Sequence, residues 1–430
     1  MQTLNSAPKQ DSIKQPDELA AHLFRREAGK ITATLTKHFG FQNVQIAEDI
    51  VQETMIAALQ HWQREIPANP TAWLYRVAKN KALDVVRCKQ RFTKVQGDIT
   101  YLQEQDAEEE HSRSLGGIFE KKSIEDSTLQ MLFACCHPVL SEEMQIALAL
   151  KTLCGLSVQE IANAFLTSKD TIEKRLYRAK ERIRERNIVV EFPKDSDLIH
   201  RMESVVRMIY LLFNEGYNSS HPDTLIRHDI CDEAQRLCRL LTENPLTNLP
   251  QANALLALML FQSSRFDARL KESGELVILS KQNPSVWDTA KIAEGARFLA
   301  ASAVGNTLSR YHLEAGIAAQ YALAPSFEAI DWREIEKLYT ALLSLAPSPI
   351  AELNLVIVRS HLYGAEAALQ ELSALEAVLE KWYLFHATRG ELLQQSGETA
   401  LAKEALQKAR RLTQSAAEQS YLERRIQDLP

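Results

Sequence analysis

Residues 156–180 read LSVQEIANAFLTSKDTIEKRLYRAK, and this stretch decides the fold of its part of the chain. Ser157 and Glu160 have the spacing of a capping box that opens a helix, and Thr167 with Asp170 repeats that spacing. The apolar residues are spaced as in two crossed, packed helices: Ile161, Ala162, Phe165, Ile172 and Leu176. The stretch therefore predicts a helix-turn-helix, although Leu166 stands in the turn where many such motifs have glycine.

The second of these helices is strongly basic. Residues 169–186 hold eight basic and four acidic side chains, a net charge of +4 within a chain whose net charge is −6. Cations on its outer face would bind phosphates, and polar side chains near its start would reach base edges. The pattern favours DNA binding, and the alternative is an amphipathic hairpin with solvated charges.

A second basic helix is predicted upstream, over about residues 71–91, because Asn69 is a good N-cap and Pro70 suits the first helical position. Residues 71–94 hold seven basic side chains and one acidic, a net charge of +6. Polar and aromatic side chains that could read or stack on unpaired bases are interleaved with them: Trp73, Tyr75 and Asn80. The alternative is a half-buried helix with Trp73 in the core.

The helix before it, around residues 47–59, is acidic. Its polar face holds Glu48, Asp49, Gln52 and Glu53. Its apolar residues are expected to pack inward: Ile50, Val51, Met55 and Leu59. Because an acidic face beside a basic helix does not help to bind DNA, it more naturally addresses a protein partner.

Composition indicates an all-α fold, since glycine and proline number only 14 each among 430 residues. Residues 96–126 hold nine acidic and three basic side chains and predict a solvated linker. Residues 195–430 are periodically apolar, as in a large helical domain. Within them Gly364 and Gly397 stand 33 residues apart, near the ~34-residue tetratricopeptide period. Two copies could equally be ordinary antiparallel helix pairs, so both interpretations remain open.

The chain is expected in the cytoplasm, because no apolar run approaches the ~20 residues that cross a bilayer and the start lacks the pattern of a signal peptide. The six cysteines are then expected as packed thiols. Cys135, Cys136 and His137 could suggest a metal site. Adjacent residues rarely converge on one ion, however, and no Cys-x-x-Cys partner is present, so no metal and no cofactor are expected.

The order of an acidic helix, the helix NPTAWLYRVAKNKALDVVR from residue 69, an acidic linker and a helix-turn-helix strongly resembles the extracytoplasmic-function sigma factors of bacterial RNA polymerase. The resemblance covers about residues 20–187. It implies that the partners are core RNA polymerase and promoter DNA, and that the protein recognises promoters without being an enzyme. It also implies a division into residues 17–95, which bind core polymerase and the −10 element, a linker at 96–126, and residues 127–187, which bind the −35 element.

The family's motifs imply site residues at matching positions. Those implied for core polymerase are Glu48, Asp49, Val51, Gln52 and Glu53. Those implied for the −10 element are Trp73, Arg76, Asn80, Lys81 and Arg87. Those implied for the −35 element are Lys169, Asp170, Thr171, Lys174, Arg175 and Arg178.

Residues 195–430 exceed a minimal family member. The segments CCHP from 135 and LLFNEGY from 211 resemble a subgroup whose long helical extension is thought to replace or supplement an anti-sigma factor. The extension is therefore expected to regulate activity, through a protein partner or an intramolecular contact.

Two other functions stay open. A stand-alone helix-turn-helix regulator with a sensing helical domain would leave both upstream helices unexplained. An enzyme in the last block would rely on acid–base candidates that have no recognised spacing: Glu215, His221, Asp223, His228, Asp229, Asp232 and Glu233.

Overall fold

The computed structural model describes residues 16–95, 118–165, 167–193, 195–219, 225–271 and 274–429. Most of these residues are helical, and the β geometry among them is one isolated antiparallel bridge between Leu270 and Leu276. The predicted all-α fold is confirmed. The chain divides into two compact units, one of Met1–Ile161 with Lys169–Arg201 and the other of Ala162–Ser168 with Met202–Pro430.

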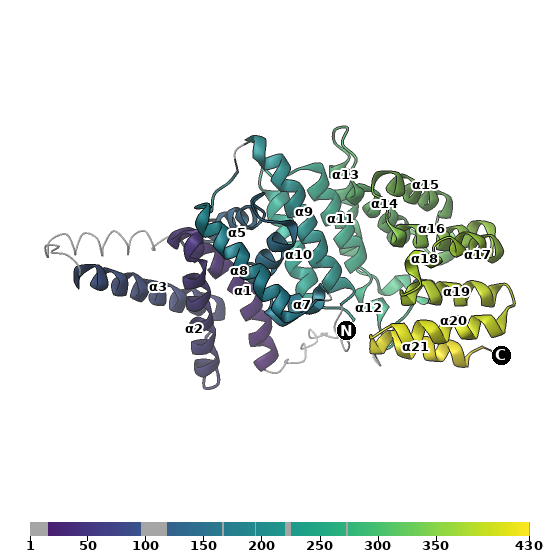
Figure 1. Ribbon diagram of the computed structural model, residues 1–430, viewed down its shortest axis with the longest axis horizontal. Helices are drawn as coiled ribbons and strands as arrows, with labels where there is room; N and C mark the ends of the chain where they lie inside the picture. The colour runs from purple at the N-terminus through teal and green to yellow at the C-terminus, as the bar shows by residue number, and fades with distance from the viewer. Residues whose placement is uncertain are drawn as a thin grey trace, which may run out of the picture. The chain divides into compact units, whose positions relative to one another are not determined.

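The helices before residue 190 belong mainly to the first unit (Figure 1). They are α1 (Pro16–Phe39), the short η1 (Phe41–Asn43), α2 (Val44–Trp62), α3 (Pro70–Val95), α5 (Lys121–Cys135), α6 (Glu142–Thr152), α7 (Val158–Ala164) and α8 (Lys169–Glu185). Both α7 and the next helix, α9 (Asp195–Tyr217), have residues in each unit.

The helices of the second unit form a larger array. After α9 they are α10 (His228–Glu243), α11 (Pro250–Ser263), α12 (Phe266–Arg269), η2 (Leu279–Lys281), η3 (Pro284–Val286), α13 (Thr289–Ser302), α14 (Arg310–Leu323), η4 (Phe327–Ala329), α15 (Trp332–Leu345), α16 (Pro349–Tyr363), α17 (Ala365–Ser373), α18 (Glu376–Leu379), α19 (Tyr383–Gln395), α20 (Thr399–Leu412) and α21 (Ala416–Gln427).

The helices α1, α2 and α3 share one hydrophobic core. Each supplies residues at helical spacing, such as Leu74, Ala78 and Ala82 of α3, which are fully buried. The start of α3 is as predicted, because the backbone N–H of Ala72 donates to the side-chain oxygen of Asn69 at 3.0 Å. The helix continues to Val95, beyond the predicted end near 91.

The acidic linker is shorter than the predicted 96–126. Helix α5 begins at Lys121, inside that range, and Ile124 is buried. The charges at 120–126 misled the assignment, because they lie on the first turns of a helix whose other face is apolar. Most of the remaining linker lies outside the described residues.

The helix-turn-helix starts as predicted and turns differently. Ser157 and Glu160 make both hydrogen bonds of the capping box, at 2.7 and 3.1 Å. The second predicted box is wrong, since α8 begins at Lys169 and so has Ser168 in the N-cap position. Thr167 instead ends the preceding helix, because its backbone N–H donates to the carbonyl of Ala162 at 2.9 Å.

The second unit is built around α11, which is apolar on every side. Its residues from Ala252 to Phe261 are buried, and it packs against α10, α13 and α14. Gly295 of α13 permits one of these contacts, since a Cβ there would lie 3.1 Å from the ring of Phe261.

Beyond α14 the helices pack on their neighbours in sequence. Three successive hydrophobic clusters each draw on consecutive helices, and α19, α20 and α21 lie side by side (Figure 1). Gly364 and Gly397 occupy equivalent turns, between α16 and α17 and between α19 and α20, with φ of 88° and 84°. Such nearest-neighbour packing is typical of helical repeat arrays.

Five of the six cysteines are buried, and Cys88 of α3 is exposed. Among the described residues, no helix combines the length and the apolar character that crossing a membrane requires.

Candidate functional site

The outer face of α2 carries most of the acidic side chains singled out by the sequence. Asp49, Gln52 and Glu53 are exposed to solvent. Val51 is different: its side chain is 7% exposed and belongs to the core, so its assignment as a contact residue is corrected to a supporting one. Glu48 is only partly accessible, because it faces α8.

Two apolar side chains on the same face were missed. Ile56 and Leu59 are 54% and 47% exposed, although Leu59 was expected to pack inward. They follow Gln52 at spacings of four and seven residues and therefore extend its face along the helix. Exposed apolar groups bordered by acids suit a protein interface better than they suit water.

The basic helix α3 presents a polar surface and buries its aromatic residues. Arg76, Asn80 and Arg87 are exposed. Trp73 is half-buried, stacks on His61 with ring centroids 5.3 Å apart, and packs against the core. Trp73 therefore has the core role as well as an accessible part.

Two of the cations expected to bind DNA are paired within the protein. Lys81 Nζ lies 2.7 Å from the Glu53 carboxylate and so joins α3 to α2. Arg87 lies 3.5 Å from Asp84, one turn away on α3. Exposed pairs of this kind contribute about 0–1 kcal/mol, so a phosphate can displace either acid.

Helix α8 separates a buried face from a basic one. Its buried face is Ile172, Leu176, Ala179 and Ile183. Lys169, Asp170, Lys174 and Arg178 are exposed, whereas Thr171 and Arg175 are partly buried. None of the described carboxylates lies within 4 Å of Lys174 or Arg178. Arg175 reaches Glu143 of α6 at 4.0 Å.

Tyr177 is a further exposed group on α8, and its ring is 64% accessible. It lines a shallow groove with Asp170, Lys174 and Arg178. Its hydroxyl donates to Glu181 at 2.8 Å, and this hydrogen bond raises the pKa of Tyr177. A neutral aromatic side chain amid cations suits contact with nucleic acid.

One contact links the two candidate surfaces. Lys180 Nζ of α8 lies 2.7 Å from Glu48 Oε2 and 2.9 Å from Gln45 Oε1 of α2. The Lys180 and Glu48 side chains are 23% and 13% exposed. The −35 candidate helix therefore occupies part of the polymerase candidate face.

The cysteine and acid–base candidates have structural partners. Burial raises the pKa of the Cys135 thiol to about 12, and burial likewise raises that of Cys136. Within the described chain, no three His, Cys, Asp or Glu side chains converge as metal ligands.

The acid–base candidates of the last block are mostly engaged in structural contacts. Glu233 is buried and pairs with Arg236 at 2.6 Å. Asp229 pairs with Arg227 at 3.4 Å, and the His228 ring packs edge-on against Phe266. His221 and Asp223 lie outside the described residues.

Family models match three segments of the chain. The models described as Sigma-70 region 2 and Sigma-70, region 4 match residues 23–92 and 130–183. A family of unknown function, DUF6596, matches residues 201–303.

Two relatives bracket the similarity. Uncharacterized protein R00370 of Rhizobium meliloti (strain 1021) is 37% identical over 390 residues, which cover 90% of this chain and 91% of the relative. ECF RNA polymerase sigma-E factor of Haemophilus influenzae is 27% identical over 176 residues, covering 40% of this chain and 90% of the relative.

Proposed function

Because this chain belongs to the sigma-70 family of the extracytoplasmic-function type and carries a helical C-terminal extension, we propose a function for each of its surfaces. The outer face of α2 binds core RNA polymerase, α3 binds the −10 element, and α8 binds the −35 element. The second unit regulates these activities.

The observation that carries the assignment of surfaces is the division of charge within the first unit. Asp49, Gln52 and Glu53 present an acidic face that Ile56 and Leu59 extend. The exposed cations lie on α3 and α8 instead. An acidic, partly apolar face suits a basic protein partner, and the cations suit phosphate.

The polymerase assignment is tested with Asp49→Ala combined with Gln52→Ala. Binding of the full chain to bacterial core polymerase is measured by fluorescence anisotropy without DNA, and transcript yield in a reconstituted reaction. We expect the affinity for core to fall by about tenfold or more, as for central interface residues. The matched control is Gln63→Ala with Glu65→Ala, which removes one amide and one acid from exposed positions after α2.

Equal core affinity of both folded double variants would reject the α2 face as the binding surface. Absence of core binding by the unsubstituted protein would reject the sigma activity itself.

The −35 assignment is tested with Lys174→Ala and Arg178→Ala. Each removes an exposed cation that has no described carboxylate partner. We expect promoter-dependent transcription to fall while core binding stays unchanged, and the salt dependence of DNA binding to weaken by about 0.9 per lost phosphate contact. Arg186→Ala, beyond the end of α8, is the control. A loss in the control equal to that in the variants would contradict a specific role for α8.

A further inference from the structure

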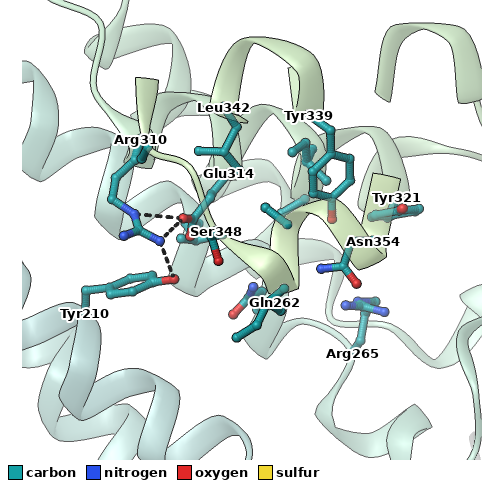
Figure 2. A pocket seen from close by; sticks show the side chains of 16 residues that line it. Tyr210, Gln262, Arg265, Arg310, Glu314, Tyr321, Tyr339, Leu342, Ser348 and Asn354 are labelled. Atoms are coloured by element: carbon teal, nitrogen blue, oxygen red, sulfur yellow. Dashed lines mark hydrogen bonds and ion pairs between the residues drawn. The ribbon is translucent and has the colours of Figure 1, made fainter. Parts of the chain in front are cut away.

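The second unit contains a cavity of about 280 Å³ between α9, α11, α14, α15 and α16 (Figure 2). Its lining combines three tyrosines, two arginines and several amides with aliphatic side chains. This volume equals that of about nine water molecules in the liquid, so the cavity is suited to a small molecule and not to a peptide.

One side of the cavity is electrically balanced. Arg310 makes two hydrogen bonds to Glu314 Oε1, at 2.8 and 3.0 Å, and its Nη2 lies 3.4 Å from the Tyr210 hydroxyl. Burial raises the pKa of Tyr210 to about 12, so the phenol stays neutral. Figure 2 shows these three side chains together, on the side of the cavity away from Arg265.

The opposite side carries a cation without a counter-charge. Arg265 is half-buried, and its Nη2 donates to the Tyr217 hydroxyl at 3.2 Å. Its guanidinium also lies 6.0 Å from the ring of Trp287. None of the described carboxylates comes within ion-pairing distance of it. Since a sheltered charge without a partner is costly, this side of the cavity favours an anion.

A second polar group in the lining lacks a partner. Gln262 Oε1 is buried and accepts no hydrogen bond from the described residues. An acceptor left in this state costs about 1–3 kcal/mol, which a hydroxyl or amino group on a ligand would recover. Asn354 lies beside Arg265 in Figure 2 and hydrogen-bonds with Tyr339. Tyr321 and Tyr339 add aromatic surface to the same side.

We propose that this cavity binds a small organic carboxylate that also carries a hydroxyl or amino group. The carboxylate pairs with Arg265, and the hydroxyl or amino group donates to Gln262 Oε1. The site lies wholly within the second unit, so the proposal does not depend on the functions proposed for α2, α3 and α8.

The test uses the full chain, with lactate and 4-hydroxybenzoate as probes and lactamide and 4-hydroxybenzamide as their neutral counterparts. Binding is measured by isothermal titration calorimetry and by the shift in melting temperature. We expect at least one carboxylate to bind saturably with a dissociation constant below about 1 mM, and its amide to bind at least about tenfold more weakly.

Three variants locate the site. Arg265→Gln removes the cation, and we expect it to weaken binding by about tenfold or more. Ala318→Leu keeps the cation and fills the cavity, so it should also abolish binding. Arg333→Gln removes an exposed arginine outside the lining and should leave binding unchanged.

The proposal is overturned if neither carboxylate binds, if acid and amide bind equally, or if both Arg265→Gln and Ala318→Leu bind like the unsubstituted chain. Because the two variants alter the cavity differently, a folding defect in one leaves the other to decide.

Discussion

At the scale of single residues, Glu27 of α1 is the most constrained acid of the first unit. Its side chain is 1% exposed and accepts hydrogen bonds from Tyr75 of α3, from Lys30 and from Arg26. Burial pushes the pKa of Glu27 upward, but these partners outweigh it and hold that pKa below the usual 4.5. The ionised form is therefore stabilised by folding.

We predict that Glu27→Gln destabilises the protein by about 1–3 kcal/mol at pH 7, because charged hydrogen bonds are lost in a buried place. A depressed pKa contributes stability above the unfolded value, and that contribution disappears as pH falls through the folded value. The difference between the variant and the unsubstituted chain should therefore shrink below about pH 4. Urea unfolding across pH measures it, with exposed Glu65→Gln as control. A difference that is constant with pH would contradict the assignment.

Residue roles that depend on close neighbours in sequence were predictable. The Asn69 cap and the Ser157–Glu160 box were both found from spacings of three residues. Pairings across the fold were not, because nothing local to Lys81 indicates Glu53, 28 residues away. The burial of Val51 was visible in its apolar spacing but conflicted with the role implied by the family.

At the scale of helices, α19 and α20 approach closely at Gly390. A Cβ at this position would lie 2.7 Å from Leu406 Cγ and 3.2 Å from the Ala402 carbonyl oxygen. We predict that Gly390→Ala lowers the stability of the second unit by about 1–3 kcal/mol through overpacking.

The control for Gly390 is Gly316→Ala, on α14. There a new Cβ would lie 3.4 Å from Leu338, an ordinary contact, and alanine favours a helix over glycine. Thermal unfolding followed by circular dichroism compares the two. Equal effects would show that helix propensity, and not the contact with α20, decides the outcome.

The contact between α2 and α8 makes a kinetic and thermodynamic prediction of its own. Glu48 cannot face both Lys180 and a polymerase, so the contact competes with core binding. We predict that Lys180→Ala increases the affinity for core polymerase about two- to fivefold, the range for a partly exposed pair.

The measurement for Lys180 is anisotropy in the absence of DNA, with Lys174→Ala as the control on the same helix. Lys174 is exposed and makes no ion pair among the described residues, so its loss should not change core affinity. Weaker core binding by Lys180→Ala would mean that the lysine supports the complex instead of opposing it.

At the scale of the whole molecule, the helical blocks were predictable and their boundaries were less so. Periodicity identified the helices because each buries one stripe. The start of α5 at Lys121 was missed because its first turns are charged, and α11 shows no periodicity because it is buried all round. Three-dimensional features such as the cavity around Arg265 leave no trace in local spacing.

The division into two units leads to a prediction about truncation. Ending the chain at residue 190 keeps α8 complete and removes the second unit from α9 onward. We expect such a protein, if circular dichroism shows it folded, to bind core polymerase with transcription output changed. Complete loss of core binding in the folded truncation would mean that the extension is part of the binding apparatus and not only a regulator.

The distribution of cysteines has a practical consequence. Cys88 is exposed on α3, beside Arg87, whereas the other five thiols are buried. A maleimide dye would therefore attach at one position without any engineering, since reaction requires an accessible thiolate. The natural protein thus offers a built-in fluorescent reporter on the helix proposed to meet the −10 element.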